Sequence, residues 1–135
     1  MVRRALTEAL GCKLGRPSMT YYEIFVVPVP RDKLDEYFAV SAQMVPMWKA
    51  FGAVSVVETR PENVPTGKVT SFPLAVKCER GELPVFAFMT FRDRAHRDAV
   101  IETAMADPAM GALMRQVPMD ARRMIFGGFT AEIEA

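Results

Sequence analysis

The side chains with the clearest capacity for chemistry are His96 and Arg97, which are adjacent in the sequence. His96 is the only histidine of the 135 residues, so one protomer cannot build a multi-histidine metal site. A helix-borne histidine that faces a sheet could ligate haem, and an arginine beside it could anchor an acidic ligand. The simpler alternatives are a half-exposed histidine and an arginine that packs its stem on apolar surface or pairs with a carboxylate such as Glu58. We expect no metal and no cofactor, with haem at His96 as the alternative.

Three aromatic residues could line a cavity for a small organic molecule. Trp48 lies in the middle of an apolar stripe with helical spacing, while Tyr22 and Phe88 belong to predicted strands. The alternative for Trp48 is an ordinary core position, with its indole N–H donated to a carbonyl oxygen. Together with His96 and Arg97, these residues form the candidate ligand pocket.

No catalytic motif accompanies that pocket. Residues 66–68 (Thr-Gly-Lys) resemble the end of a phosphate-binding loop, but Glu62 stands where the motif needs glycine and Val69 where it needs serine or threonine. The sequence also lacks a G-x-S-x-G elbow and a zinc-binding cysteine pattern. Catalytic residues therefore stay unknown, and whether the protein is an enzyme stays open.

The elements that must position these residues alternate between strands and helices. Periodicity and capping signals predict strands over residues 21–29, 53–59, 83–91 and 124–133, and helices over 32–52, 93–106 and from 107 onward. Pro46 should kink the first helix, residues 69–77 should be extended, and Gly127-Gly128 should mark a bulge or the close approach of another backbone. This order predicts an α+β, ferredoxin-like fold with four main antiparallel strands and both helical segments on one face.

The predicted strands are apolar on both faces, whereas the helices can cover only one. A second copy of the chain is the simplest cover for the other face, which predicts a homodimer built as a dimeric α/β barrel. The partners we expect are therefore the chain itself and a small-molecule ligand.

Composition limits the remaining possibilities. Residues 1–18 carry four basic residues and one acidic residue, so they are expected to form an extension outside a single domain over residues 19–135. The rest of the chain holds 13 basic and 15 acidic residues, which argues against a nucleic-acid partner. Without an apolar run long enough for a membrane span or a secretory signal, the sequence predicts a cytoplasmic protein with no membrane contact, in which Cys12 and Cys78 stay reduced.

Four segments carry a resemblance to a known family. Residues 25–30, 64–77, 105–110 and 123–129 resemble the bacterial YbaA-like family of unknown function (domain of unknown function 1428), and the second segment is the most specific. The resemblance covers residues 19 to about 135. It implies membership of the dimeric α/β-barrel superfamily, and with it the fold and the dimer, but it supplies no activity and no catalytic residues.

Two functions follow as hypotheses. The first is a homodimer that binds a small apolar organic ligand, similar to an oxygenase or isomerase by superfamily analogy alone. The alternative is a non-catalytic dimer that serves stress responses or protein interactions.

Overall fold

The computed structural model of the chain describes residues 20–135, so the predicted extension over residues 1–18 and Cys12 lie outside the described residues. Its centre is one antiparallel sheet in the order β2-β3-β1-β4. The strands are β1 (Tyr21–Pro30), β2 (Ser55–Glu58), β3 (Glu82–Phe91) and β4 (Ile125–Thr130). All three neighbouring pairs are antiparallel, as the predicted ferredoxin-like arrangement requires.

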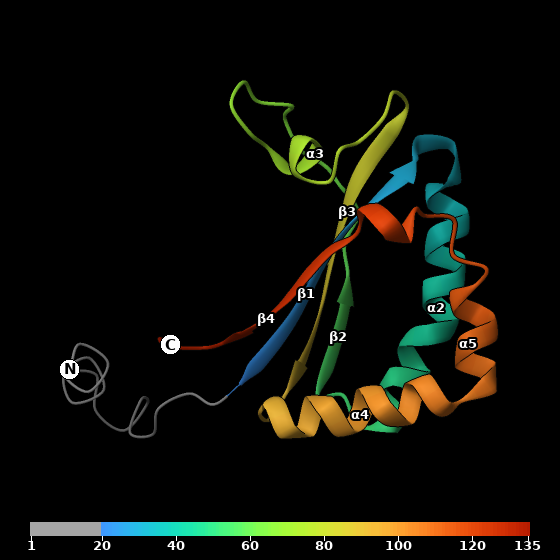
Figure 1. The fold of residues 1–135 in the computed structure, drawn as a ribbon, viewed down its shortest axis with the longest axis vertical. Helices are drawn as coiled ribbons and strands as arrows, with labels where there is room; N and C mark the ends of the chain where they lie inside the picture. The colour runs from blue at the N-terminus through green and yellow to red at the C-terminus, as the bar shows by residue number, and fades with distance from the viewer. Residues whose placement is uncertain (1–19) are drawn as a thin grey trace.

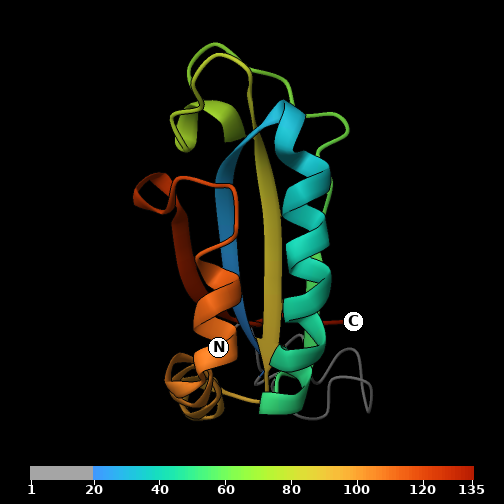
Figure 2. The same cartoon turned by 90° about the vertical axis from the view of Figure 1, so that its right-hand side faces the viewer.

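The long helices lie on one face of this sheet, with α2 beside α5 and α4 across one end (Figures 1 and 2). They are α2 (Leu34–Phe51), α4 (Arg94–Ala106) and α5 (Pro108–Met114), and short 3-10 turns stand at Arg31–Lys33 (η2) and Ala121–Arg123 (η3). Two predicted N-caps are confirmed: a carboxylate oxygen of Asp93 accepts from the His96 N–H at 2.8 Å, and one of Asp107 accepts from the Met110 N–H at 3.0 Å. Within residues 20–135, no helix combines the length and the apolar character that crossing a bilayer requires.

Helix α2 runs as one helix through Pro46 and ends where predicted, at Gly52. Gly52 has φ of 123°, a backbone conformation that favours glycine, and its N–H closes the last turn on Trp48 and Lys49. This helix places Tyr37, Ser41 and Trp48 on the buried side, toward the sheet.

Strand β1 runs through Pro28 and Pro30, one residue beyond the predicted range of 21–29. Pro28 stands opposite Pro84 of β3, and neither proline has an N–H to give the other. Both nitrogens must therefore face away from this pair. The paired segments of β4 and β2 end before reaching them, since β4 pairs with β1 only as far as Val26 and β2 pairs with β3 only from Ala87.

The excursion between β2 and β3 contradicts the predicted extended segment over residues 69–77. It contains a short helix, α3 (Phe72–Ala75), because the Ser71 hydroxyl caps it by accepting from the Leu74 N–H at 3.1 Å. Pro73 occupies the first turn, where a missing donor costs nothing. Figure 1 shows α3 and its loops on the side of the sheet opposite α2 and α5.

Strand register divides the sheet residues into an inner face, toward the helices, and an outer face. On the inner face Phe91 and Val85 are fully buried. On the outer face Tyr22 and Phe88 lie 5.9 Å apart between ring centroids, and Phe88 and Phe86 lie 6.1 Å apart. The long helices therefore cover one apolar face only, as the sequence predicted, and the short helix α3 lies on the other side.

The Gly127-Gly128 pair makes no bulge, because each glycine keeps its place in the register with β1. The close approach at Gly128 comes from a side chain, since a Cβ there would lie 1.6 Å from the Tyr21 hydroxyl oxygen. The expected bulge was wrong, and Gly128 is needed because the Tyr21 phenol occupies the space that a Cβ would fill.

Candidate functional site

A cavity of about 350 Å³ lies between the inner face of the sheet, α2 and the segment that follows α5. Its size falls at the lower end of the range for small-molecule sites. The lining is almost wholly apolar: Phe25, Val27, Tyr37, Ser41, Met44, Val45, Trp48, Val56, Glu58, Ala87, Phe88, Met89, Met114, Val117, Met119, Ala121 and Met124. Among these described lining residues, Glu58 is the only one with a charged side chain.

Glu58 stands at the end of β2 and is held by two hydroxyl groups from α2. The Tyr37 hydroxyl donates to its Oε1 at 2.9 Å, and the Ser41 hydroxyl donates to its Oε2 at 3.2 Å. These donors lie one helical turn apart, so a single face of α2 meets both carboxylate oxygens. The arrangement fixes the carboxyl group at the cavity wall.

Burial controls the protonation of this group. It raises the pKa of Glu58 above 4.5, although the hydrogen bonds from Tyr37 and Ser41 act in the opposite direction. Burial also raises the pKa of Tyr37, and the neighbouring Glu58 charge raises it further, so the phenol keeps its proton. A carboxyl group in this setting holds a proton more tightly than an exposed glutamate does, so it is a candidate to accept a proton from a ligand.

Five methionines give the cavity a deformable wall. Unbranched thioether side chains adapt to irregular shapes and make favourable contacts with aromatic rings. Trp48 adds a rigid surface, set edge-on to Phe51 with ring centroids 6.4 Å apart. This combination suits a flat apolar molecule better than a highly polar one.

The structure brings only part of the predicted pocket together. Trp48 lines the cavity, and Phe88 borders it while its ring packs on the outer face with Tyr22. Tyr22 does not line the cavity, because its register partner Thr90 and its neighbour Phe88 place it on the opposite side of the sheet. Alternation along β1 and β3 separates these residues, and sequence alone did not say which face the helices would cover.

Arg97 points toward the sheet as predicted, but it pairs with Glu23 and not with Glu58. Its Nε lies 3.4 Å from a Glu23 carboxylate oxygen and 3.2 Å from one of Asp98, and its Nη2 donates to the Tyr21 hydroxyl at 3.1 Å. The suggested pairing with Glu58 was wrong because Glu58 lies where β2 meets α2, away from α4. Two carboxylates already balance the charge of Arg97, which leaves less of it for an acidic ligand.

His96 is half-buried at the start of α4 and does not line the cavity. Its Nδ1 accepts from the Arg92 backbone N–H at 3.0 Å, and its ring stands edge-on to Phe91 with centroids 5.7 Å apart. That hydrogen bond leaves the proton on Nε2, the nitrogen a haem iron would have to bind. In the described part of the chain, no cluster of three or more histidine, cysteine or acidic residues could hold a metal ion.

Sequence reasoning missed Glu58 as a site residue, although a signal was present. In the string Ser55–Glu58, Val56 and Glu58 share a face, so the carboxylate follows an apolar inner position. Tyr37 and Ser41 likewise bring polar groups to the apolar stripe of α2. Polar groups on two apolar faces that pack together indicate a buried network.

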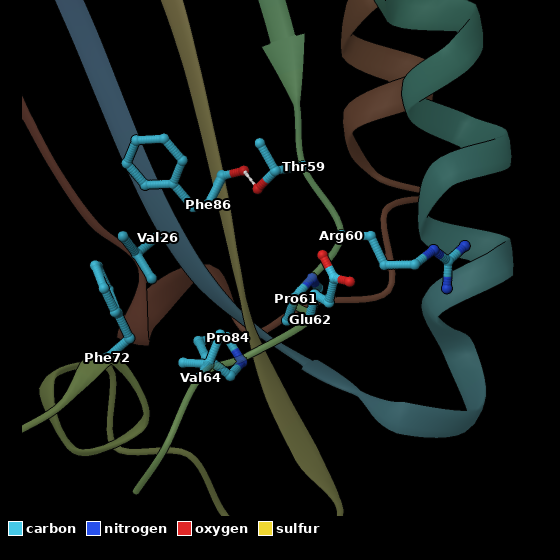
Figure 3. Close-up of a pocket in the computed structure, with 9 residues that line it drawn as sticks. All are labelled: Val26, Thr59, Arg60, Pro61, Glu62, Val64, Phe72, Pro84 and Phe86. Atoms are coloured by element: carbon cyan, nitrogen blue, oxygen red, sulfur yellow. Dashed lines mark hydrogen bonds between the residues drawn. The ribbon is translucent and has the colours of Figure 1, made fainter. Parts of the chain in front are cut away.

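A second hollow, of about 260 Å³, lies on the outer face under the excursion. Figure 3 shows Phe72 and Val64 of the excursion close to Val26 and Pro84 of the strands. Phe72 keeps 55% of its surface exposed, so the wall is open to solvent. This hollow contains no buried acid or base, unlike the inner cavity.

The topology and the one-sided helical layer define an α+β protein of the ferredoxin-like class. A solved structure agrees: a dimeric ferredoxin-like protein from an uncultured marine organism superposes with a TM-score of 0.56 at 12% identity, covering 89% of this chain and 100% of its own. The chain belongs to the family described as "Protein of unknown function (DUF1428)", whose model matches residues 20–121. It is 42% identical over 116 residues to the uncharacterized protein YbaA of Escherichia coli K12, and equally to that of Shigella flexneri, covering 86% of this chain and 99% of each relative.

Proposed function

We propose that residues 19–135 form one domain of a cytoplasmic homodimer, and that each protomer binds a small, mainly apolar organic molecule in the inner cavity. The observation that carries the proposal is the cavity itself: about 350 Å³ of apolar space with one anchored carboxyl group. Convergent polar groups in an apolar pocket are typical of sites that orient a ligand. The proposal assigns no cofactor, and the superfamily-based expectation of an oxygenase or isomerase stays a prediction.

The outer face supports the dimer. Phe129, Ile125 and Val57 leave 60%, 43% and 36% of their surfaces exposed there. A contact of standard size covers about 800 Å² per partner, and at about 25 cal/mol per Å² it gains roughly 20 kcal/mol of gross burial per protomer before the cost of association. The structurally similar marine protein is itself dimeric.

Two measurements test the proposal. Sedimentation equilibrium should give twice the chain mass at micromolar concentration, and a monomer would contradict the dimer. A thermal-shift screen of one- and two-ring organic compounds should find ligands that raise the melting temperature and change Trp48 fluorescence, because Trp48 is the only tryptophan and lines the cavity. Hits that stabilise the protein without changing that fluorescence would place binding elsewhere.

One observation favours the non-catalytic alternative. Both carboxylate oxygens of Glu58 already have hydroxyl partners within the protein, as in a network that serves stability alone. Under this alternative the screen finds no ligand, while the dimer persists.

A further inference from the structure

The polar groups around Glu58 restrict what the cavity can accept. The Tyr37 and Ser41 hydroxyl groups both donate hydrogen bonds to the carboxylate, so neither is available to donate to a ligand. Each carboxylate oxygen has a second lone-pair position after accepting one hydrogen bond. The network therefore offers acceptors, and a ligand group that meets it must donate.

The charge of the cavity lining further restricts which ligands can bind. The inner cavity lacks a lysine, arginine or histidine among its described lining residues, so an anionic ligand would meet Glu58 without compensation. Two like charges in an apolar setting are strongly unfavourable. A carboxylate or phosphate ligand is thus disfavoured, and a neutral ligand fits.

The volume of the inner cavity limits the size of the ligand. A cavity of about 150 Å³ holds benzene, so a cavity more than twice as large suits about two rings. The flat indole of Trp48 and the methionine thioethers provide contacts for such rings.

We propose that the ligand is a neutral two-ring molecule with one acidic hydroxyl group, a phenol or an enol, which donates to the Glu58 carboxylate and can pass its proton to it. This inference rests on the proposed ligand site and names the chemical class that occupies it. In the transfer, the ligand O–H bond breaks and an O–H bond forms on Glu58, so the negative charge moves to the ligand oxygen. No other reactant is needed.

Two features support the transfer. The carboxylate occupies a fixed position between α2 and β2, so it is oriented before the ligand arrives. Burial raises the pKa of Glu58, which strengthens its hold on a proton relative to an exposed glutamate. Among the lining residues, Tyr37 is the only other group that titrates, and it keeps its proton.

The test compares 2-naphthol with naphthalene, which has the same rings without the hydroxyl. Photoexcited naphthol is a strong acid and emits at longer wavelength once it has lost its proton, so its emission reports a nearby proton acceptor. The wild-type protein should bind naphthol about tenfold or more tightly than naphthalene, because hydrogen bonds to charged groups are the strong ones, and the complex should show naphtholate emission. Glu58→Gln should still bind both compounds but show neutral emission only.

Glu36→Gln is the matched control, since Glu36 lies on the exposed side of the same helix, and it should behave as wild type. Equal affinity for the two compounds, with neutral emission from the wild-type complex, would overturn this inference while leaving the ligand site intact. If neither compound binds, the ligand site itself fails. Should Glu58→Gln not fold, wild-type protein decides: lowering the pH through the Glu58 pKa must weaken naphthol binding and leave naphthalene binding unchanged.

Discussion

The two faces of the sheet are both apolar, yet they carry their polar residues differently. The inner face holds two carboxylates, Glu23 and Glu58, where helices exclude water. The outer face presents the Tyr22, Phe88 and Phe86 rings, and the one acidic residue on its paired strand positions is Glu82, at the start of β3, where Arg123 binds it. Burying a carboxylate is costly, so its presence on the covered face indicates a role beyond packing. The apolar outer face needs only a cover.

The two inner carboxylates also differ from each other. Glu23 faces the guanidinium of Arg97, whereas Glu58 has only hydroxyl partners. A cation lies beside the first carboxylate, while the second has no counter-ion and burial raises its pKa. Glu23 thus resembles a structural ion pair, and Glu58 a group that exchanges protons.

The largest effect is expected from removing the rigid wall of the inner cavity. Trp48→Ala should lower the free energy of unfolding by about 3–5 kcal/mol, since it deletes a buried aromatic side chain and enlarges a void. Urea denaturation measures this loss. Met105→Ala, at a 55% exposed site on α4, should change it by less than about 0.5 kcal/mol. Equal losses of unfolding free energy in the two variants would mean that Trp48 stabilises the fold no more than an exposed methionine does.

The substitution Phe129→Asp tests whether the outer face is the dimer interface. A carboxylate placed in a sheet-on-sheet contact would be buried without a partner, so the dissociation constant of the dimer should rise by about 100-fold or more. Sedimentation across a concentration series measures the dissociation constant. Met105→Asp introduces the same charge at a similarly exposed site away from this face and should leave the dimer intact. If Phe129→Asp stays as dimeric as Met105→Asp, the outer face is not the interface.

A matched pair of glycines tests how closely the inner face is packed beside β4. Gly128→Ala places a methyl group on the Tyr21 phenol and should cost about 1–3 kcal/mol, because the ring is buried and held by Arg97. Gly127→Ala meets the Phe129 ring at an ordinary 3.5 Å and should be far milder. Chemical denaturation of both variants gives the difference, and similar losses would contradict a specific clash at Tyr21.

The Glu58 network predicts an unusual pH dependence. Because burial raises the folded-state pKa of Glu58, the folded protein binds this proton more tightly than the unfolded chain does. The contribution of Glu58 to stability is therefore greatest at low pH and falls as pH rises through the folded-state pKa. Relative to Glu58→Gln, the wild type should therefore lose stability as the pH rises from 4.5 through the folded-state pKa of Glu58. Thermal melts of both proteins over this range give the comparison. A wild type that gains stability relative to the variant over that range would reverse the assigned sign.

The smallest effect on stability, with the opposite dependence on pH, is expected at the start of β3. Arg123 binds Glu82 through two nitrogens at 2.6 and 2.9 Å, which lowers the pKa of Glu82. This stability is present above pH 4.5 and is lost as pH falls through the depressed pKa. Glu82→Gln should cost about 1 kcal/mol or less at pH 7 and nothing at the lowest pH. Glu79→Gln, whose carboxylate lies 3.8 Å from Arg123 and is mostly exposed, should cost less still. Acid titration of the melting temperature separates the two.

Local signals predicted much of the fold. Asp93 and Asp107 correctly predicted the starts of α4 and α5, and Gly52 the end of α2, because a cap depends on residues within one helical turn. Ser71 carried the same kind of signal for α3, but residues 69–77 were predicted to be extended and that signal was not used. The end of β1 was predicted to within one residue, although only the sheet reveals why its prolines are tolerated, namely that the neighbouring strand is absent beside them.

The sequence by itself determined the period of the main strands and long helices, the caps of α2, α4 and α5, and the apolar character of both sheet faces, since these depend on neighbours along the chain. Only the tertiary structure decided which face the helices cover, and hence that Trp48 lines the cavity while Tyr22 faces outward. It also decided that Glu58 meets Tyr37 and Ser41, which lie 21 and 17 residues away in the sequence. Hydrogen bonds across such separations depend on how a strand crosses a helix, and one-dimensional spacing does not encode that crossing.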